Sequence, residues 1–94
     1  MVAVAQNLRS IVDHDGGVIL DIPHDTLTSL NAIGAYVWRR LEEGQRVDAI
    51  VTELARDTGA DSTVVARDVD EFLEHLKTRH LIFSPHERND GSRF

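Results

Sequence analysis

The spacing of the apolar residues changes once in this chain, at Asn31, and that change limits the possible folds more than any other feature. Residues 24–30 (HDTLTSL) alternate with the two-residue period of a β-strand, whereas residues 31–43 follow the period of an α-helix. Asn is a favourable N-cap residue, so the helix can begin directly after the strand without a linker. Strands followed by helices predict an α+β domain.

Two more strands are expected upstream of this change. An alternating apolar stretch ends at Val12, and the segment DHDGG (13–17) that follows contains Asp and Gly, which favour a tight hairpin turn. The segment VILDI (18–22) is the second strand, and Pro23 ends it because proline cannot donate to a ladder. Together with residues 25–30, these segments predict a three-stranded antiparallel meander whose last strand has one open edge.

The remaining apolar residues predict three helices. Gly44 and Gly59 are expected to end the first and second helices in left-handed conformations, and Asp61 or Ser62 is expected to cap the third. The third helix carries an apolar stripe at helical spacing, formed by Val65, Val69, Phe72, Leu73 and Leu76. The short apolar segment LIF at 81–83 is expected to pair with the sheet or to pack on the helices.

We therefore expect one winged-helix-like domain of the α+β class over residues 1–83, in which a three-stranded antiparallel sheet precedes a three-helix bundle. A chain of 94 residues is too short for two independent cores. Residues 84–94 are polar apart from Phe94 and are expected to form a flexible tail.

The composition narrows the classes of function. The chain has no cysteine, which excludes a thiol nucleophile, a disulfide scaffold and a thiolate metal site. No apolar run approaches the roughly 20 residues that cross a bilayer, and no basic region precedes an apolar segment at the amino end, so neither a membrane span nor a signal peptide is expected. We expect a cytoplasmic protein.

No set of residues indicates catalysis, and no cofactor or metal is expected. Glu71 and His75 have a spacing that can hold a zinc ion, but such a site needs further ligands, and surface charge pairing explains both residues. Ser62 follows Asp61 in a way that suits a phosphopantetheine attachment site. Helix capping explains this pair equally well, and the strands at the start do not suit an all-helical carrier.

A winged-helix fold also suggests a DNA-binding regulator. The third helix offers Arg67, Lys77 and Arg79 as contacts to phosphates or bases. It also carries four carboxylates, and the formal net charge of the chain is −6. Such a surface repels a phosphate backbone, so no nucleic-acid partner is expected.

Several segments in a fixed order resemble the PqqD-like family, also called the RiPP recognition element. They are DGGVILDI, LNAIGAYVWRRLEEG, VDAIVTELA and DVDEFLEHLKTRHLI, and the likeness covers roughly residues 11–83. Within this family, the sequence resembles the small stand-alone proteins of lasso-peptide biosynthesis. One departure is His80, which stands where the family usually has Gly. A left-handed His is tolerated there at some cost in strain.

The resemblance implies a non-catalytic binding function. Members of this family bind the leader segment of a ribosomally made precursor peptide, which adds antiparallel to the third strand, and present it to a modifying enzyme. In this sequence the strand corresponds to Asp25, Thr26, Leu27, Thr28, Ser29 and Leu30, and the helix wall to Val65, Asp68, Val69, Phe72 and Leu76. The implied partners are a precursor leader peptide and a leader protease or other modifying enzyme. A chaperone for a radical enzyme in cofactor synthesis is the alternative within the family.

The residues alone support a simpler interpretation, which remains open at this point. Phe72, Leu73 and Leu76 are explained as core residues when each is taken singly, and so are Tyr36 and Trp38. Without the resemblance, the sequence predicts only a small α+β domain.

Overall fold

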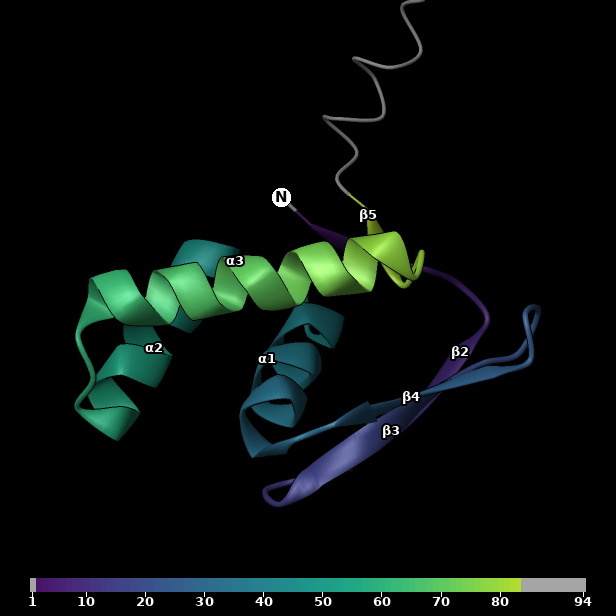
Figure 1. Ribbon diagram of the computed structural model, residues 1–94, viewed down its shortest axis with the longest axis horizontal. Coiled ribbons are helices and arrows are strands. Elements are labelled where there is room, and N and C mark those ends of the chain that lie inside the picture. The colour runs from purple at the N-terminus through teal and green to yellow at the C-terminus, as the bar shows by residue number, and fades with distance from the viewer. Residues whose placement is uncertain (1, 84–94) are drawn as a thin grey trace, which may run out of the picture.

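The computed structural model describes residues 2–83, so the expected tail at 84–94 lies outside the described residues. The elements in chain order are β1 (Ala3–Val4), β2 (Leu8–Asp13), β3 (Gly16–Asp21), β4 (Thr26–Leu30), α1 (Ala32–Glu42), α2 (Val47–Thr58), α3 (Ser62–Thr78) and β5 (Ile82–Phe83). The three strands of the main sheet precede the three helices, as expected, and the short strand β5 follows them (Figure 1).

The main sheet is an antiparallel meander with the strand order β2-β3-β4. The turn between β2 and β3 contains only residues 14–15, since Asp13 pairs with Gly16. The Asp13 carboxylate accepts the backbone N–H of Gly16 at 3.2 Å. Gly16 has a φ of 146°, and a Cβ at this position would lie 2.6 Å from the carbonyl oxygen of Leu30. Only glycine fits at this end of the sheet.

The apolar segment at 81–83 pairs with the beginning of the chain and not with the main sheet. Strands β1 and β5 form a separate two-stranded antiparallel sheet, with Ala3 opposite Phe83 and Val4 opposite Ile82. His80 has a φ of 62°, which turns the chain out of α3 toward this second sheet. The left-handed conformation expected at His80 is thus present.

The helix ends lie where the sequence places them. The Asn31 side chain accepts the backbone N–H of Gly34 at 2.8 Å, and that of Asp61 accepts the N–H of Thr63 at 2.7 Å. Gly44 and Gly59 have φ values of 81° and 74°. These caps satisfy backbone groups that would otherwise lack partners at the helix ends.

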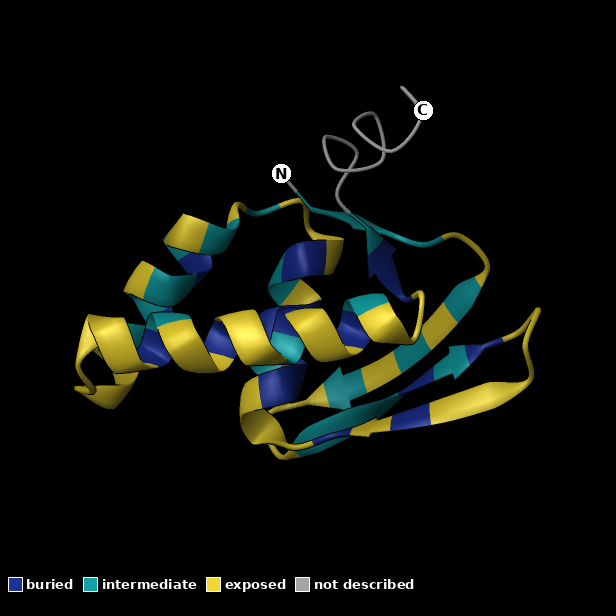
Figure 2. Cartoon of the chain, turned by 45° about the horizontal axis from the view of Figure 1, so that its top comes forward, coloured by how far each residue is buried: buried dark blue, intermediate teal, exposed yellow. Residues whose placement is uncertain are grey.

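One face of the main sheet packs on the helices through α1, and α2 packs against α3 (Figure 1). The buried core joins Ile19 of the sheet to Trp38, Ile50 and Leu76 of the three helices, and each of these four residues is 0% exposed. The other sheet face lies away from the helices and is largely exposed (Figure 2). This arrangement leaves β4 at an edge of the sheet, directly before α1.

Candidate functional site

The outer edge of β4 is open in the part of the chain that the structure describes. Within residues 2–83, β4 pairs with β3 on one side and with no strand on the other. An unpaired edge of this kind presents backbone donors and acceptors to any extended segment that reaches it.

The register shows which backbone groups of β4 point outward. The N–H of Ile22 donates to the carbonyl oxygen of Asn7 at 3.4 Å, so the even-numbered residues of β3 direct their backbone groups toward β2. The odd-numbered residues therefore bond to β4, and Ile19 opposite Thr28 is one of these hydrogen-bonded pairs. It follows that Leu27 and Ser29 direct their N–H and C=O groups to the open edge.

The side chains of β4 alternate in the other direction, between the helical side and solvent. Thr28 is 5% exposed and Leu30 is 9% exposed, and both lie on the face that packs on the helices. Leu27 is 59% exposed on the opposite face, and Ser29 is also exposed there. The backbone of Leu27 and Ser29 is thus at the edge, while their side chains point away from the helices.

The first residue of the expected strand differs from this pattern. Asp25 lies in the turn before β4, with a φ of 53°, and its N–H donates to the carbonyl oxygen of Ile22 at 3.3 Å. Thr26, the first residue of β4, is exposed. The strand is therefore one residue shorter than expected, because Asp25 closes the turn that follows Pro23.

An apolar cavity of about 220 Å³ lies among α1, α2 and α3. Four of the five expected wall residues line it, namely Val65, Asp68, Val69 and Phe72. Ile33 lines it from the first turn of α1, which follows β4 directly, and is 46% exposed. Val65 and Val69 are 6% and 1% exposed, so they belong to the core as well as to the cavity wall. The fifth expected residue, Leu76, is 0% exposed, belongs to the core and does not line the cavity.

The Phe72 ring lies close to the backbone of α1 at Gly34. A Cβ built on Gly34 would lie 3.3 Å from Cε1 of the Phe72 ring, so the absence of a side chain allows the ring to approach the helix backbone. The ring itself is only partly buried. Phe72 thus contributes to the core on one side and to the cavity on the other.

A second, larger cavity of about 550 Å³ adjoins the first, since Ile33, Leu54 and Thr58 line both. Its other lining residues include the charged side chains Asp13, Arg39 and Asp57. Ile33 therefore stands between an apolar cavity and a more polar one.

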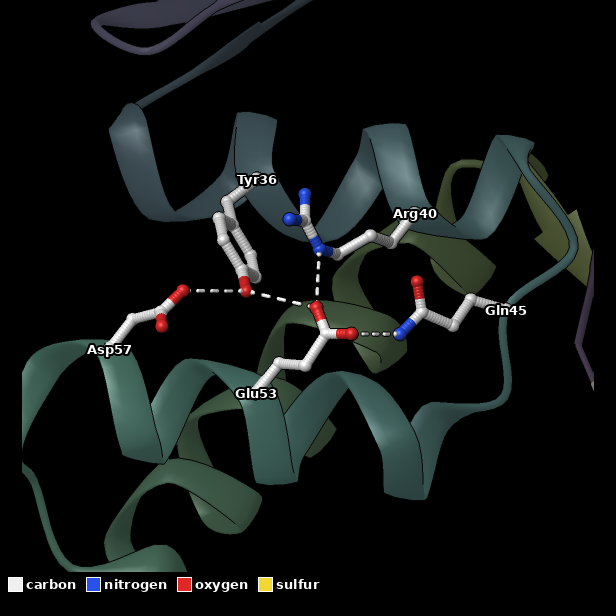
Figure 3. A network of polar contacts seen from close by, with 5 residues as sticks. All are labelled: Tyr36, Arg40, Gln45, Glu53 and Asp57. Carbon is white, nitrogen blue, oxygen red and sulfur yellow. Dashed lines mark hydrogen bonds and ion pairs between the residues drawn. The ribbon is translucent and has the colours of Figure 1, made fainter.

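A polar network beside this cavity joins α1 to α2 (Figure 3). Glu53 accepts from Arg40 at 3.1 Å and from Gln45 at 2.9 Å. The Tyr36 hydroxyl donates toward Glu53 and Asp57 at 3.3 Å and 3.2 Å, and the Arg40 guanidinium lies 3.6 Å from the centre of the Tyr36 ring. Each of these five side chains is bonded to at least one other, which is typical of a structural contact between helices.

The titration of this network has clear physical causes. The hydrogen bond from Arg40 lowers the pKa of Glu53, and the bond from Gln45 lowers it further. Burial raises the pKa of the Tyr36 hydroxyl, and its bond to Asp57 raises it further. The lowered pKa keeps Glu53 ionised at neutral pH, and the raised pKa keeps the Tyr36 hydroxyl protonated. Neither group is therefore poised to transfer a proton near neutral pH.

A further polar cluster lies on the inner face of the sheet near the beginning of β4, away from the cavities. The Asp21 side chain is 6% exposed and bonds His24 Nδ1 at 2.8 Å, and it also accepts the backbone N–H of His24 at 3.3 Å. Arg79, directly after α3, donates from Nη1 to the Thr28 hydroxyl at 3.1 Å. The inner face of β4 is thus polar near its start and apolar near Leu30.

The described residues offer no metal or membrane site. In residues 2–83, no group of three His, Asp or Glu side chains is arranged to hold a metal ion. None of the described helices is both long enough and apolar enough to cross a bilayer.

Two residues of this region were missed as contacts in the sequence. The helical spacing of Ile33 to Val37 predicts a buried position in the first helix, yet Ile33 is 46% exposed and lines the cavity. For Arg79, the sequence suggests only a contact to DNA. Its bond to Thr28 joins residues 51 positions apart, and local spacing carries no signal for such a contact.

Comparison with known proteins is consistent with this geometry. The sequence profile described as coenzyme PQQ synthesis protein D (PqqD) matches residues 16–82, which run from β3 to β5. No curated protein sequence matches significantly. Among solved structures, the chain is similar to TbiB1 in complex with the TbiA(beta) leader peptide, with a TM-score of 0.80 and 30% sequence identity over 85% of this chain and 93% of TbiB1. The chain therefore belongs to the PqqD family.

Proposed function

We propose that this protein is a non-catalytic binding protein for the leader segment of a ribosomally synthesised precursor peptide. The leader adds to the outer edge of β4 as a further strand, and the protein delivers it to a modifying enzyme. In the lasso-peptide version of this function, that enzyme is the leader protease.

One observation carries the proposal: the open edge of β4 lies directly before the helix turn that lines an apolar cavity. An added strand obtains affinity from the backbone of the edge and specificity from pockets for alternate side chains. This protein has an open strand edge and an adjacent apolar cavity. TbiB1, a solved structure to which the chain is similar, is in complex with a leader peptide.

The energetics indicate how much of the site a leader must use. Leu27 and Ser29 together offer four outward backbone groups, which contribute about 4 kcal/mol at a net ~1 kcal/mol per hydrogen bond. A micromolar complex requires about 8 kcal/mol. At about 2–3 kcal/mol for each buried apolar side chain, at least two such side chains of the leader must also be buried. The apolar cavity and the exposed side of Ile33 supply surface for them.

The family description favours a second candidate for the partner enzyme. The matching family is described as a protein of coenzyme PQQ synthesis. The alternative enzyme that receives the peptide is therefore a radical enzyme of cofactor synthesis. The binding step on β4 is the same in both cases, and only the enzyme that accepts the complex differs.

Titration with labelled peptides tests the proposal. Fluorescence anisotropy would measure binding of the TbiA(beta) leader peptide and of the leader of any small precursor encoded beside this gene. We expect micromolar or tighter binding of at least one leader and about tenfold weaker binding by Ser29→Pro, which removes an outward donor. Equal affinity of both proteins for the same leader would show that the edge of β4 is not the site.

A further inference from the structure

Arg79 connects the end of α3 to the inner face of β4. Its Nη1 donates to the Thr28 hydroxyl at 3.1 Å, across 51 positions of sequence. Thr28 is 5% exposed, whereas Arg79 is exposed. The guanidinium group is therefore held at the surface, directly beside the strand whose outer edge is open.

This guanidinium group has no carboxylate partner among residues 2–83. Arg40 and Arg46, in contrast, form ion pairs with Glu53 and Asp48. A neutral hydroxyl occupies one of the five N–H donors of Arg79, so several donors are available for an acceptor with negative charge.

The buried carboxylate on the same sheet face is already in use. Asp21 lies on β3, opposite Thr26, and its two oxygens accept from the ring and the backbone of His24. Asp21 is therefore not a partner of Arg79, and the remaining donors of Arg79 are open to a carboxylate from outside residues 2–83.

The register places a side chain of an added strand next to Arg79. Thr28 forms a hydrogen-bonded pair with Ile19, so an antiparallel strand added at the outer edge would face Thr28 in a non-hydrogen-bonded pair. Such pairs bring their side chains closest together, and opposite residues point to the same face of the sheet. The peptide side chain opposite Thr28 would thus emerge on the face where the Arg79 guanidinium lies.

We propose that Arg79 is a specificity-determining residue that selects an acidic side chain at the peptide position opposite Thr28. This inference rests on the proposed function of β4. Because alternate residues of a strand share a face, the acidic residue stands two or four positions from an apolar residue that reaches the cavity lined by Phe72. The recognised peptide therefore combines one carboxylate and one apolar side chain at even spacing.

A displayed library of random 12-residue peptides tests this without knowledge of the natural leader. The library is selected on the wild-type protein, on Arg79→Gln and on Arg56→Gln. The last variant is the control, since it removes the same charge from an exposed position on α2. We expect wild type and Arg56→Gln to enrich peptides with an acidic residue at even spacing from an apolar one. Arg79→Gln should retain only the apolar preference.

Affinity measurements on one selected acidic peptide provide a second readout. We expect Arg79→Gln to weaken binding about fivefold at low salt, Arg79→Lys to retain most of the affinity, and the difference to diminish at high salt, as for an exposed ion pair. Circular dichroism of each variant would verify that the fold is intact.

The outcomes separate this inference from the proposed function. Selection by the wild-type protein of apolar peptides with no acidic position would overturn the role of Arg79. If Ser29→Pro weakens the binding of these peptides, strand addition stays in place. An acidic preference that persists in Arg79→Gln would also overturn it. Selection of no peptide at all, or selection that Ser29→Pro leaves unchanged, would contradict strand addition itself, and the inference would fall with it.

Discussion

The ring of Phe72 lies so close to Gly34 that a Cβ at residue 34 would stand 3.3 Å from Cε1 of the ring. This contact joins α3 to the first turn of α1, which begins where β4 ends. Because this ring lines the apolar cavity, the shape of the cavity is sensitive to a single methyl group at residue 34.

Gly34→Ala should therefore separate binding from stability. Alanine in place of glycine favours the helix by up to about 1 kcal/mol. This gain offsets the small shifts that the added methyl group, 3.3 Å from both Asn31 Oδ1 and Phe72 Cε1, imposes on the N-cap side chain and on the ring. We expect a melting temperature equal to or above that of the wild type and leader affinity reduced several-fold, by thermal denaturation and fluorescence anisotropy. Unchanged affinity would mean that the peptide does not depend on the position of the Phe72 ring.

Phe72→Ala and Leu76→Ala should distinguish the cavity wall from the core. Leu76 is 0% exposed, so its truncation should destabilise the fold by about 2–5 kcal/mol. Phe72 is only partly buried and lines the cavity, so its truncation should cost less stability and weaken peptide binding more. Urea denaturation and anisotropy would measure the two effects. The reverse ranking in both assays would place Phe72 in the core and the binding wall elsewhere.

Proline substitutions at adjacent positions of β4 should have different effects. Ser29 directs its N–H to the open edge, so Ser29→Pro should fold normally and weaken leader binding by about 1 kcal/mol or more. Thr28 directs its N–H to Ile19 of β3, so Thr28→Pro should break the existing ladder and lower the melting temperature. If Thr28→Pro is as stable as wild type, the assignment of inward and outward backbone groups is wrong.

The network around Glu53 predicts a stability change at acidic pH. The pKa of this carboxyl is lowered from 4.5 in the folded protein, so its contribution is present above that value and is lost as the pH falls through the folded-state pKa. We expect Glu53→Gln to lower the melting temperature at neutral pH and to have a progressively smaller effect as the pH falls below about 4.5. A melting-temperature difference that is independent of pH would show that the ionised carboxylate does not stabilise the contact between α1 and α2.

The sequence predicts the order of the three main-sheet strands and the three helices because local features determine it, but it does not predict β1 as a separate strand. The change of period at Asn31, the capping by Asp61 and the left-handed residues Gly59 and His80 all depend on neighbouring residues alone. The open edge of β4 also followed from the meander pattern, since β4 is the last strand before the helices.

Contacts between distant segments were not predictable in the same way. The spacing between Ile33 and Val37 is helical, but only the packing of three helices shows that Ile33 stands at a cavity rim. The pairing of β1 with β5 and the bond from Arg79 to Thr28 depend on where α3 ends in space. The apolar stripe on α3 likewise does not show that Leu76 is fully buried in the core whereas Phe72 is partly exposed.

Amide hydrogen exchange at Leu27 and Ser29 tests the central claim most directly. Both N–H groups point to the open edge of β4, whereas that of Thr28 is already bonded within the sheet. We predict that a bound leader peptide slows exchange strongly at Leu27 and Ser29 and changes it little at Thr28. Exchange at Leu27 and Ser29 that is equally fast with and without saturating leader would contradict strand addition at β4.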